Sequence, residues 1–569
     1  MQPFTETPHT ASHAMLRVLA SSSIDRVFVV PGESYLGILD ALSDFPDIDV
    51  VTCRHESGAS FMAGVDGRLT GRPGVAMVSR GPGAANAAIG LHAAQQDAVP
   101  LILVIGQVPK RHLRMGAFQE IDYQQMYGSI AKWVYEVTSP EDLELAAFKA
   151  VRIAMSDTPG PVVLAIPEDV QQQRVDTHHW RAAPAIPAPT DPTTVARIEK
   201  HLASAHRPLI IAGSMLARPG GREALLRLAE RRRIPVVVSF RNHDLFPNDH
   251  PLFAGNLDLA NPAGQIAAFD SSDLILALGT RLGDITTQGY RFPRLPRPSQ
   301  FLVHCYPDTQ VINQHFAADI GIAGDAAGLA QALSVSGETP ASEERAAWVK
   351  MLKDNQAHYS AWPVPAAADD GVPFAQVVQA LARHKSDDMM ICLDAGTFAA
   401  PVYRHFGFTP SQRLIASFSG AMGYGTPAAV AAQLRHPEKK VICLVGDGGF
   451  MMTGNEMIAA AERKLPILFI LSNNHCYGSI RLHQARTYPG RYAGTGLTNP
   501  DFVSIARAFG MTTEHVADVG QIDGAIQRGL QSKTPYLIEV ETSLSSILPD
   551  QGVPDHDHQD TLPSRTAQA

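Results

Sequence analysis

The sequence predicts an α/β fold with three doubly wound parallel sheets, and three observations support this prediction. Short apolar segments rich in β-branched residues alternate with helical patterns along all 569 residues. Glycine, aspartate or proline bounds these segments, which is typical of parallel strands buried on both faces. A single hydrophobic core stops growing at about 250–300 residues, so a chain of this length is expected to form several domains.

The strand-like segments fall into three groups along the chain. They are Arg26–Val30, Val75–Val78, Leu101–Ile105 and Val162–Ile166 in the first group, Leu209–Ala212 and Leu274–Leu278 in the second, and Met390–Leu393, Val441–Val445, Ile467–Leu471 and Leu537–Val540 in the third. Helical patterns between them cover Ala84–Gln96, Gly221–Arg232 and Asn455–Arg463.

Two Pro-rich segments separate these groups and are expected to be extended linkers. Residues 182–193 read AAPAIPAPTDPT and residues 362–373 read WPVPAAADDGVP. We therefore expect a first domain over residues 1–180, a central domain over 193–340 and a third domain over 365–550. The polar residues 551–569 are expected to form a tail.

Composition and charge exclude several classes of protein. The net charge of −9 gives no reason to expect a nucleic-acid partner. Five scattered cysteines lack metal-ligand spacing and indicate reduced thiols in a cytoplasmic protein. No apolar run reaches the roughly 18 residues of a membrane span, and residues 1–13 lack the apolar core of a signal peptide.

The strongest local signal lies in the third group of strands. Val441–Val445 runs into Gly446-Asp447-Gly448-Gly449, with a helix expected near Asn455, and Ile467–Leu471 runs into Ser472-Asn473-Asn474. Open α/β sheets bind ligands at the carboxyl ends of their strands. Glycine lets a phosphate approach the backbone, and carboxylate and amide oxygens are ligands that Mg²⁺ prefers. A lone Gly-Asp-Gly would indicate a turn, but this pair predicts a magnesium–diphosphate site.

The same pair resembles the signature of thiamin-diphosphate enzymes. The resemblance implies that Asp447, Asn474 and the backbone carbonyl of Cys476 bind the metal. Over nearly the whole chain, other segments resemble the large subunit of acetolactate synthase. They are Arg54-His55-Glu56, Gly71 to Val75, Gly81 to Asn86, Gly106 to Pro109, Ala117-Phe118-Gln119-Glu120, Ser419 to Gly425, Arg491-Tyr492 and Pro500-Asp501-Phe502.

The resemblance implies roles for individual residues. Glu56 would hydrogen-bond a pyrimidine nitrogen of the cofactor and favour its activation, and a second carboxylate, Glu33, stands where some decarboxylases of the superfamily hold a catalytic acid. Phe118 and Gln119 match residues that face the substrate. The remaining cofactor-binding residues implied are Gly396, Gly420, Met422, Gly446, Gly448, Gly449 and Asn86.

The resemblance also implies active sites that are shared between subunits. Glu56 would act on a diphosphate held by another subunit, so a homodimer or homotetramer is expected.

Several positions depart from the acetolactate synthase pattern. Glu33 lies in Val30-Pro31-Gly32-Glu33-Ser34 instead of a Pro-Gly-Gly turn, and it could equally be an ordinary acid at a helix N-terminus. His483 stands where the synthase has Trp. Thr397-Phe398 replaces a frequent His-Gln, which leaves the contact at Gly396 open. Arg281 matches a Gly-Ala-Arg strand end of the synthase and could hold a carboxylate. It could instead face a sugar or phosphate on a cofactor domain, or form a surface pair.

The central domain gives little support for a flavin. Phe253-Ala254-Gly255-Asn256 lacks the synthase's Met-His-Gly, and Gly213-Ser214 does not continue into a complete Gly-x-Gly-x-x-Gly. We therefore expect thiamin diphosphate and Mg²⁺ but no FAD.

Three functional hypotheses follow. The first is a carboligase that decarboxylates a 2-oxo acid, pyruvate by default, and transfers the acyl carbanion to a carbonyl acceptor. The second is a non-oxidative decarboxylase or C–C lyase for another 2-oxo or 2-hydroxyacyl substrate, with Glu33 as proton donor. The third is an inactive thiamin-binding assembly subunit, against which the intact Glu56, Asp447 and Asn474 argue.

Overall fold

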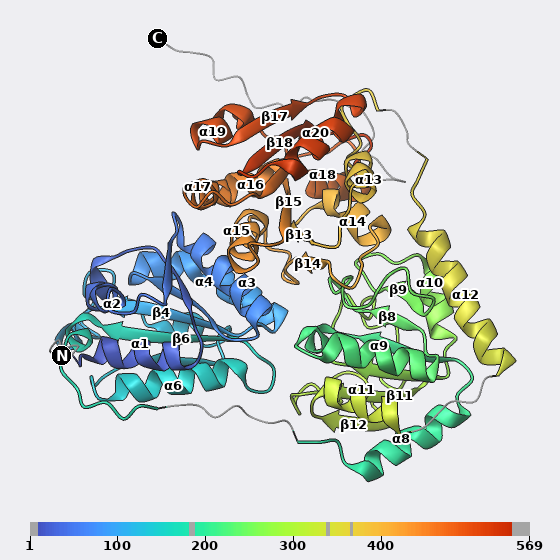
Figure 1. The fold of residues 1–569 in the computed structure, drawn as a ribbon, viewed down its shortest axis with the longest axis horizontal. Coiled ribbons are helices and arrows are strands. Elements are labelled where there is room, and N and C mark those ends of the chain that lie inside the picture. The colour runs from blue at the N-terminus through green and yellow to red at the C-terminus, as the bar shows by residue number, and fades with distance from the viewer. Residues whose placement is uncertain (1–8, 181–187, 337–341, 365–367, 549–569) are drawn as a thin grey trace, which may run out of the picture. The chain divides into compact units, whose positions relative to one another are not determined.

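The computed structural model describes residues 9–180, 188–336, 342–364 and 368–548 (Figure 1). Its eighteen described strands form three six-stranded parallel sheets, which confirms the predicted α/β class. The ten strand segments expected from the sequence are all strands. Residues 182–187 of the first linker, residues 365–367 of the second and the tail 551–569 lie outside the described residues.

The first sheet has the order β2-β1-β3-β4-β6-β5. Its strands are β1 (Arg26–Val29), β2 (Asp49–Thr52), β3 (Gly74–Val78), β4 (Leu101–Gln107), β5 (Trp133–Glu136) and β6 (Pro161–Pro167). Its helices are α1 (Ala11–Ser21), α2 (Leu36–Leu42), α3 (Glu56–Thr70), α4 (Gly81–Asp97), α5 (Tyr123–Tyr127), α6 (Asp142–Met155) and α7 (Glu168–Gln171). Helices α1 and α6 pack together on one face of the sheet, and α3 and α4 pack together on the other (Figure 1).

The second sheet has the order β12-β11-β10-β7-β8-β9. Its strands are β7 (Pro208–Ala212), β8 (Val236–Val238), β9 (Phe253–Asn256), β10 (Leu274–Leu278), β11 (Phe301–Tyr306) and β12 (Ile320–Ala323). Its helices are α8 (Pro192–Ser204), α9 (Gly221–Arg232), α10 (Ala263–Asp270), α11 (Ala326–Val335) and α12 (Glu343–Ser360).

The third sheet has the order β14-β13-β15-β16-β18-β17. Its strands are β13 (Met389–Leu393), β14 (Arg413–Ile415), β15 (Lys440–Gly446), β16 (Leu468–Asn473), β17 (Thr512–Val516) and β18 (Tyr536–Glu541). Its helices are α13 (Phe374–Arg383), α14 (Ala400–His405), α15 (Gly425–Arg435), α16 (Asp447–Thr453), α17 (Met457–Glu462), α18 (Gly478–Thr487), α19 (Phe502–Ala508) and α20 (Val519–Gln531).

Each sheet has a point at which the direction of strand addition reverses. The reversal lies between β1 and β3 in the first sheet, between β7 and β10 in the second, and between β13 and β15 in the third. Helices that follow the two flanking strands lie on opposite faces, so a crevice that can bind a ligand opens at their carboxyl ends. The loops after β1 and β3 therefore border this crevice in the first sheet, and those after β13 and β15 border it in the third.

Two compact units make up the chain. The first contains Met1–Ser360 and Gly407–Ser419, and the second contains Ala361–Phe406 and Gly420–Ala569. The sheets lie within the three domain ranges expected from the sequence, whose boundaries stay a prediction. Their central strands are fully buried, including β3, β4, β7, β10 and β13, because helices cover both faces.

The helix expected after the Gly-Asp-Gly-Gly segment begins earlier than the sequence predicts. Helix α16 starts at Asp447 itself, and the predicted Asn455–Arg463 helix is a short 3₁₀ turn, Gly454–Glu456, followed by α17. An acidic residue in the first helical turn interacts favourably with the helix dipole and offsets the poor helix propensity of the glycines.

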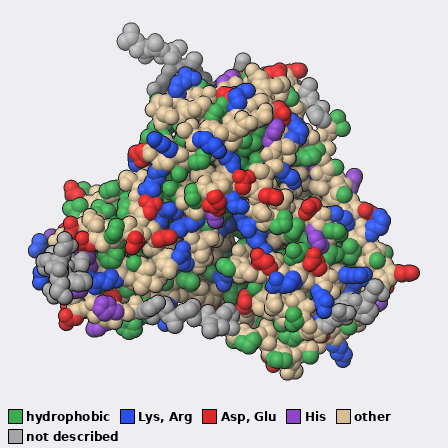
Figure 2. All heavy atoms as spheres, viewed as in Figure 1, with side chains coloured by type: hydrophobic (Ala, Val, Ile, Leu, Met, Phe, Trp, Pro, Cys, Tyr) green, Lys and Arg blue, Asp and Glu red, His purple; other side chains and the backbone are tan. Residues whose placement is uncertain are grey.

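Acidic and basic side chains are interspersed on the molecular face shown in Figure 2, together with exposed hydrophobic side chains. In the part of the chain that the structure describes, no helix is long and apolar enough to cross a bilayer.

Candidate functional site

Asp447 lies at the carboxyl end of β15, beside the reversal point of the third sheet. Its side chain is buried; Oδ1 accepts a hydrogen bond from the Gly448 N–H at 2.9 Å, and Oδ2 accepts one from the Asn499 amide at 2.8 Å. Burial raises the pKa of Asp447, although the hydrogen bonds from Asn499 and the backbone oppose this. A cation at this carboxylate would compensate the cost of burying its charge, so the site fits a metal ion.

The turn after β16 holds the other two predicted metal ligands. The Oδ1 atom of Asn474 accepts a hydrogen bond from the Cys476 N–H at 3.1 Å, and the Cys476 carbonyl accepts one from the Gly478 N–H at 2.8 Å. A carbonyl oxygen has a second lone pair, so Cys476 can still bind a metal. The described residues contain no group of three His, Cys, Asp or Glu side chains suited to a metal. A site of carboxylate, amide and carbonyl oxygens instead fits Mg²⁺ completed by phosphate.

The glycines after β15 are required by their neighbours. A Cβ on Gly448 would lie 2.4 Å from the Tyr477 ring, and a Cβ on Gly449 would lie 2.9 Å from a carboxylate oxygen of Asp394. This close packing brings the N-terminus of α16 against the turn that contains Cys476. The two strand-end motifs that the sequence predicts to act together are therefore in contact within the second unit.

Asn499 is a residue that the sequence reasoning missed. Its Nδ2 atom lies 2.8 Å from Asp447 Oδ2 and 2.8 Å from Asn473 Oδ1, so one amide joins the ends of β15 and β16. Asn473 is held in turn by a 2.8 Å hydrogen bond to Glu539 on β18. Asn499 lies in an irregular segment just before Pro500, where no periodic pattern marks a functional side chain.

The Met422 turn is fixed by the buried carboxylate of Asp394, which follows β13. Both carboxylate oxygens lie within 3.0 Å of the Gly423 N–H, and Oδ2 also accepts from Gly425 at 3.3 Å. Burial raises the pKa of Asp394 to about 6, against these hydrogen bonds. Met422 is half-buried, and Gly420 and Gly396 have φ angles of 65° and 153° that favour glycine.

The first unit presents Glu56 at the start of α3. His55 caps this helix through its ring nitrogen, which accepts the Ser57 N–H at 3.2 Å. The Asn86 amide on α4 donates to Glu56 Oε2 at 2.9 Å, and a Cβ on Gly83 would lie 3.2 Å from Glu56 Oε1. Asn86 therefore holds the carboxylate that the sequence singles out, and Gly83 leaves room for it.

The other predicted residues of the first sheet lie at its reversal point. Glu33 is exposed at the start of a 3₁₀ turn after β1. The Gln119 carbonyl accepts the Gly81 N–H at 3.0 Å, and its side-chain oxygen accepts from Arg80 Nε at 3.3 Å. Phe118 is 78% exposed. Arg80, two residues after the end of β3, is a second residue that the sequence reasoning missed.

Some predicted residues do not join these clusters. Arg281 donates a hydrogen bond to the Gln96 carbonyl near the end of α4, which favours its structural reading. His483 is exposed on α18. Glu56 and Asp447 belong to different units of the chain.

The reversal point of the second sheet is filled by backbone. A Cβ on Gly213 would lie 2.4 Å from the Gly279 carbonyl oxygen, so the ends of β7 and β10 pack directly together.

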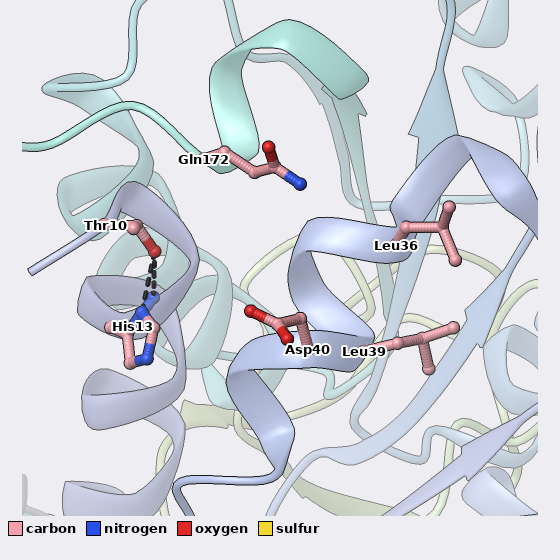
Figure 3. Close-up of a pocket in the computed structure, with 6 residues that line it drawn as sticks. All are labelled: Thr10, His13, Leu36, Leu39, Asp40 and Gln172. Carbon is pink, nitrogen blue, oxygen red and sulfur yellow. Dashed lines mark hydrogen bonds between the residues drawn. The ribbon is translucent and has the colours of Figure 1, made fainter. Parts of the chain in front are cut away.

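A surface depression of about 720 Å³ lies between α1 and α2. Thr10, His13, Leu36, Leu39, Asp40 and Gln172 line it, from α1, α2 and the end of α7 (Figure 3). Thr10 and His13 hydrogen-bond each other at 2.7 Å (Figure 3), and His13 also contacts Asp44 at 2.9 Å, so the polar groups that line it are partly satisfied internally. It contains none of the predicted site residues.

Comparison with known proteins gives matches along most of the chain. Models of the N-terminal TPP binding, central and C-terminal TPP binding domains of thiamine pyrophosphate enzymes match residues 9–126, 195–333 and 394–540. The acetolactate synthase large subunit of Parasynechococcus marenigrum is 30% identical over 94% of this chain and 88% of its own length. That of Corynebacterium glutamicum is 31% identical over 93% and 86%. The isozyme 2 large subunit of Escherichia coli is 29% identical over 92% and 94%.

Proposed function

Because this chain belongs to the thiamin-diphosphate enzymes related to acetolactate synthase large subunits, we propose that it is a 2-oxo acid-decarboxylating carboligase. It removes CO₂ from a 2-oxo acid, with pyruvate as the default donor, and transfers the remaining acyl group to a carbonyl acceptor. The observation that carries the proposal is the Glu56–Asn86 hydrogen bond, which holds a carboxylate at the start of α3, after β2.

Asp447, Asn474 and the Cys476 carbonyl bind Mg²⁺ in this proposal, and Gly446, Gly448 and Gly449 allow the diphosphate to approach the start of α16. Helix N-termini favour phosphate groups because their free N–H groups and dipole are positive. The buried Asp447, whose pKa burial raises, supports a bound cation. Gly396 adds a further backbone approach near the diphosphate.

The aminopyrimidine ring binds at Gly420 and Met422, in the turn that Asp394 fixes. Glu56 hydrogen-bonds a ring nitrogen and holds a proton there, which requires a carboxyl group and not merely a polar one. When bound, thiamin diphosphate supplies a nucleophilic carbon and an electron sink. Phe118 and Gln119 face the substrate, and the exposed Phe118 is available to limit the access of water.

A second candidate function is favoured by Glu33. This carboxylate is exposed at the reversal point of the first sheet, next to Gly32, where a Cβ would lie 2.6 Å from that of Ser79. A carboxyl group so placed can deliver a proton instead of leaving the acyl group for an acceptor. The enzyme would then be a non-oxidative decarboxylase or a C–C lyase.

Product analysis with pyruvate distinguishes the two functions. The carboligase gives acetolactate, whereas the decarboxylase gives acetaldehyde alone, and absence of CO₂ release excludes pyruvate as donor. Glu56→Gln is expected to reduce turnover by about 100-fold or more, the contribution typical of an acid–base group. Unchanged turnover in this variant would show that Glu56 does not activate the cofactor.

A homodimer or homotetramer is part of the proposal, with Glu56 of one subunit serving the diphosphate residues of its partner. The exposed apolar side chains that support a subunit interface include Leu36, Ile89, Met115 and Phe118 in the first unit and Met451, Met452 and Ile480 in the second.

Mixing two inactive variants tests this arrangement. If sites are shared between subunits, random mixing of E56Q and D447N chains restores about a quarter of wild-type activity, because half the dimers are mixed and each has one intact site. If each site belongs to one chain, mixing restores none.

The enzyme is proposed to work without FAD. Support comes from the second sheet, where Gly213 and Gly279 close the reversal point at which a dinucleotide would otherwise approach. Full activity of purified protein that shows no flavin absorbance is the expected result, and a flavin that copurifies in equal amount would contradict it.

A further inference from the structure

Arg80 stands at the reversal point of the first sheet with most of its hydrogen-bonding capacity unused. It lies two residues after the end of β3, and the loop with Glu33 follows β1 on the other side of that point. The Arg80 backbone N–H donates to Ser34 Oγ at 3.3 Å, and its side chain is only 14% exposed. Of five guanidinium donors, only Nε has a hydrogen-bond partner among the described residues, the Gln119 side chain.

The surroundings of Arg80 offer a second unused donor. Tyr123 is 2% exposed, and its hydroxyl has no hydrogen-bond partner among the described residues. The hydroxyl lies beside the Gly81 amide and interacts electrostatically with Arg80. Burial raises the pKa of Tyr123, so the hydroxyl stays protonated and can donate a hydrogen bond. Buried polar groups without partners are rare. The unpartnered Tyr123 hydroxyl, next to an Arg80 guanidinium with only one hydrogen bond among the described residues, therefore points to a ligand at this strand end.

This place is adjacent to the predicted catalytic carboxylate. Gly83 lies between Glu56 and the segment that contains Arg80. A Cβ added to Gly83 would lie 3.2 Å from Glu56 Oε1 and 3.5 Å from the Cβ of Ser79, the residue before Arg80. A small molecule reacting near Glu56 would therefore extend toward Arg80 and Gln119.

We propose that Arg80 is a specificity-determining residue that binds the carboxylate of a 2-oxo acid acceptor. The inference rests on the proposed carboligase function and deepens it by naming how the acceptor is chosen. A guanidinium binds a carboxylate through two parallel hydrogen bonds, which fixes orientation as well as charge.

The acceptor carboxylate is a better partner for Arg80 than the donor carboxylate. The donor carboxylate leaves as neutral CO₂, so an ion pair to it would be lost on the way to the transition state and would stabilise only the ground state. The acceptor keeps its carboxylate throughout, so the same ion pair remains in the transition state of carbon–carbon bond formation.

Glu168 competes with a bound carboxylate for the Arg80 guanidinium. Glu168 Oε2 lies 3.6 Å from Arg80 Nη1, and Glu168 is 38% exposed. A partly exposed ion pair of this length contributes at most about 1 kcal/mol, so a bidentate carboxylate can displace it. Glu33 and Glu56 also lie at this edge of the sheet, and their negative charges oppose the binding of an anion. Binding of an anionic acceptor here therefore depends on the positive charge of Arg80.

The test compares 2-oxobutanoate with propanal, which has the same carbon chain without the carboxylate. With pyruvate as donor, KM for each acceptor is measured in wild type, Arg80→Gln, Arg80→Lys and Glu168→Gln. Arg80→Gln is expected to raise the ratio of KM for 2-oxobutanoate to KM for propanal by about 10- to 100-fold, as expected for a hydrogen-bonded charge. Arg80→Lys recovers part of the loss, and Glu168→Gln lowers KM for 2-oxobutanoate by removing the competitor.

Arg111→Gln is the matched control, because it removes an exposed guanidinium from the loop after β4. It should change the ratio by less than about 2-fold, the effect of a screened surface charge. If Arg80→Gln raises KM for both acceptors equally, Arg80 only supports Gln119 and the proposal is overturned. A rise in KM with Glu168→Gln would also overturn it.

Direct binding separates this proposal from the proposed function. If wild-type protein releases no CO₂ from pyruvate, the carboligase function fails for that donor. Calorimetric binding of 2-oxobutanoate to the full-length protein loaded with thiamin diphosphate and Mg²⁺ then still decides the role of Arg80. Affinity lost in Arg80→Gln but kept in Arg111→Gln supports the proposal, and equal affinity in both variants contradicts it.

Discussion

The side-chain amide of Asn499 donates to Asp447 Oδ2 and to Asn473 Oδ1, at 2.8 Å in each case. This contact orients the predicted metal-binding carboxylate and ties it to the strand that leads to Asn474. Asn499→Ala is expected to weaken Mg²⁺-dependent binding of thiamin diphosphate by about 10- to 100-fold, the usual cost of removing a group that orients a metal ligand. Isothermal titration calorimetry at fixed Mg²⁺ measures the change.

The neighbouring Thr498 provides the control for this prediction, because it is exposed on the same segment. Thr498→Ala should leave the dissociation constant within about 2-fold, as for most surface substitutions. An Asn499→Ala protein that binds the cofactor as tightly as wild type would show that Asp447 needs no such support.

Gly448 is expected to tolerate no side chain, because its Cβ would lie 2.4 Å from the Tyr477 ring. Gly448→Ala must displace Tyr477 and with it the adjacent Cys476 carbonyl. We expect a loss of about 1–3 kcal/mol in the free energy of unfolding, as for other overpacked sites, together with weaker cofactor binding. Chemical denaturation and calorimetry measure the two effects.

Removing the ring should relieve the clash. In the double variant Gly448→Ala/Tyr477→Ala, the two losses of stability are expected to be less than additive, since the residues are in contact. Gly283→Ala is the control, because a Cβ there meets open space. Additive losses in the double variant would place the cause of the Gly448 effect elsewhere.

Local patterns predicted the fold well because the strands are apolar and continuous. Helix α9 has the bounds expected from its pattern, Gly221–Arg232. The Gly446–Gly449 and Asn473–Asn474 motifs lie at strand ends as expected, since a change from apolar to polar residues marks the end of a buried strand. The start of α16 was predicted wrongly, because Gly446, Gly448 and Gly449 have poor helix propensity. Its acidic first residue, Asp447, and its packing stabilise the helix nevertheless.

Contacts between residues far apart in the sequence could not be predicted from local patterns. Asn499 and Arg80 form hydrogen bonds to residues far away in the sequence, and neither belongs to a periodic pattern. Asp97 is a further example: its buried Oδ1 accepts the Phe418 N–H at 2.6 Å and the Ser417 hydroxyl at 3.1 Å, across more than 300 residues. Only the folded chain shows which polar residues meet, because burial and hydrogen-bond partners depend on tertiary packing.

Asp394 is expected to give the cofactor-free protein a specific dependence of stability on pH. Its pKa in the folded chain is about 6, above the ordinary value of 3.8, so the folded state binds more protons than the unfolded state between these values. Stability contributed by the protonated carboxyl is therefore present below about pH 4 and is lost as the pH rises through about 6. A difference of about two pKa units corresponds to about 3 kcal/mol.

Asp394→Asn provides the comparison, since an amide does not titrate. Urea denaturation of both proteins from about pH 4 to about pH 8 should show wild type losing up to about 3 kcal/mol relative to the variant as pH rises. The lost acceptor for Gly423 adds a constant offset to this difference. Stability curves that run parallel over the whole range would assign the pH dependence to other groups.

The hydrogen bond from Asn86 to Glu56 Oε2 is expected to control how fast the bound cofactor is activated. Asn86→Ala leaves the carboxylate without its donor and free to turn from the position that the ring nitrogen requires. Exchange of the cofactor C2 proton for deuterium, followed by NMR after acid quench, should slow by about 10-fold, the effect of a hydrogen bond to a charged group.

Asn86→Asp should slow this exchange more, since like charges would face each other. Ala85→Ser, at an exposed neighbour on α4, should leave the exchange rate unchanged. Exchange at the wild-type rate in Asn86→Ala, with Glu56→Gln still slow, would mean that packing against Gly83 alone positions the carboxylate.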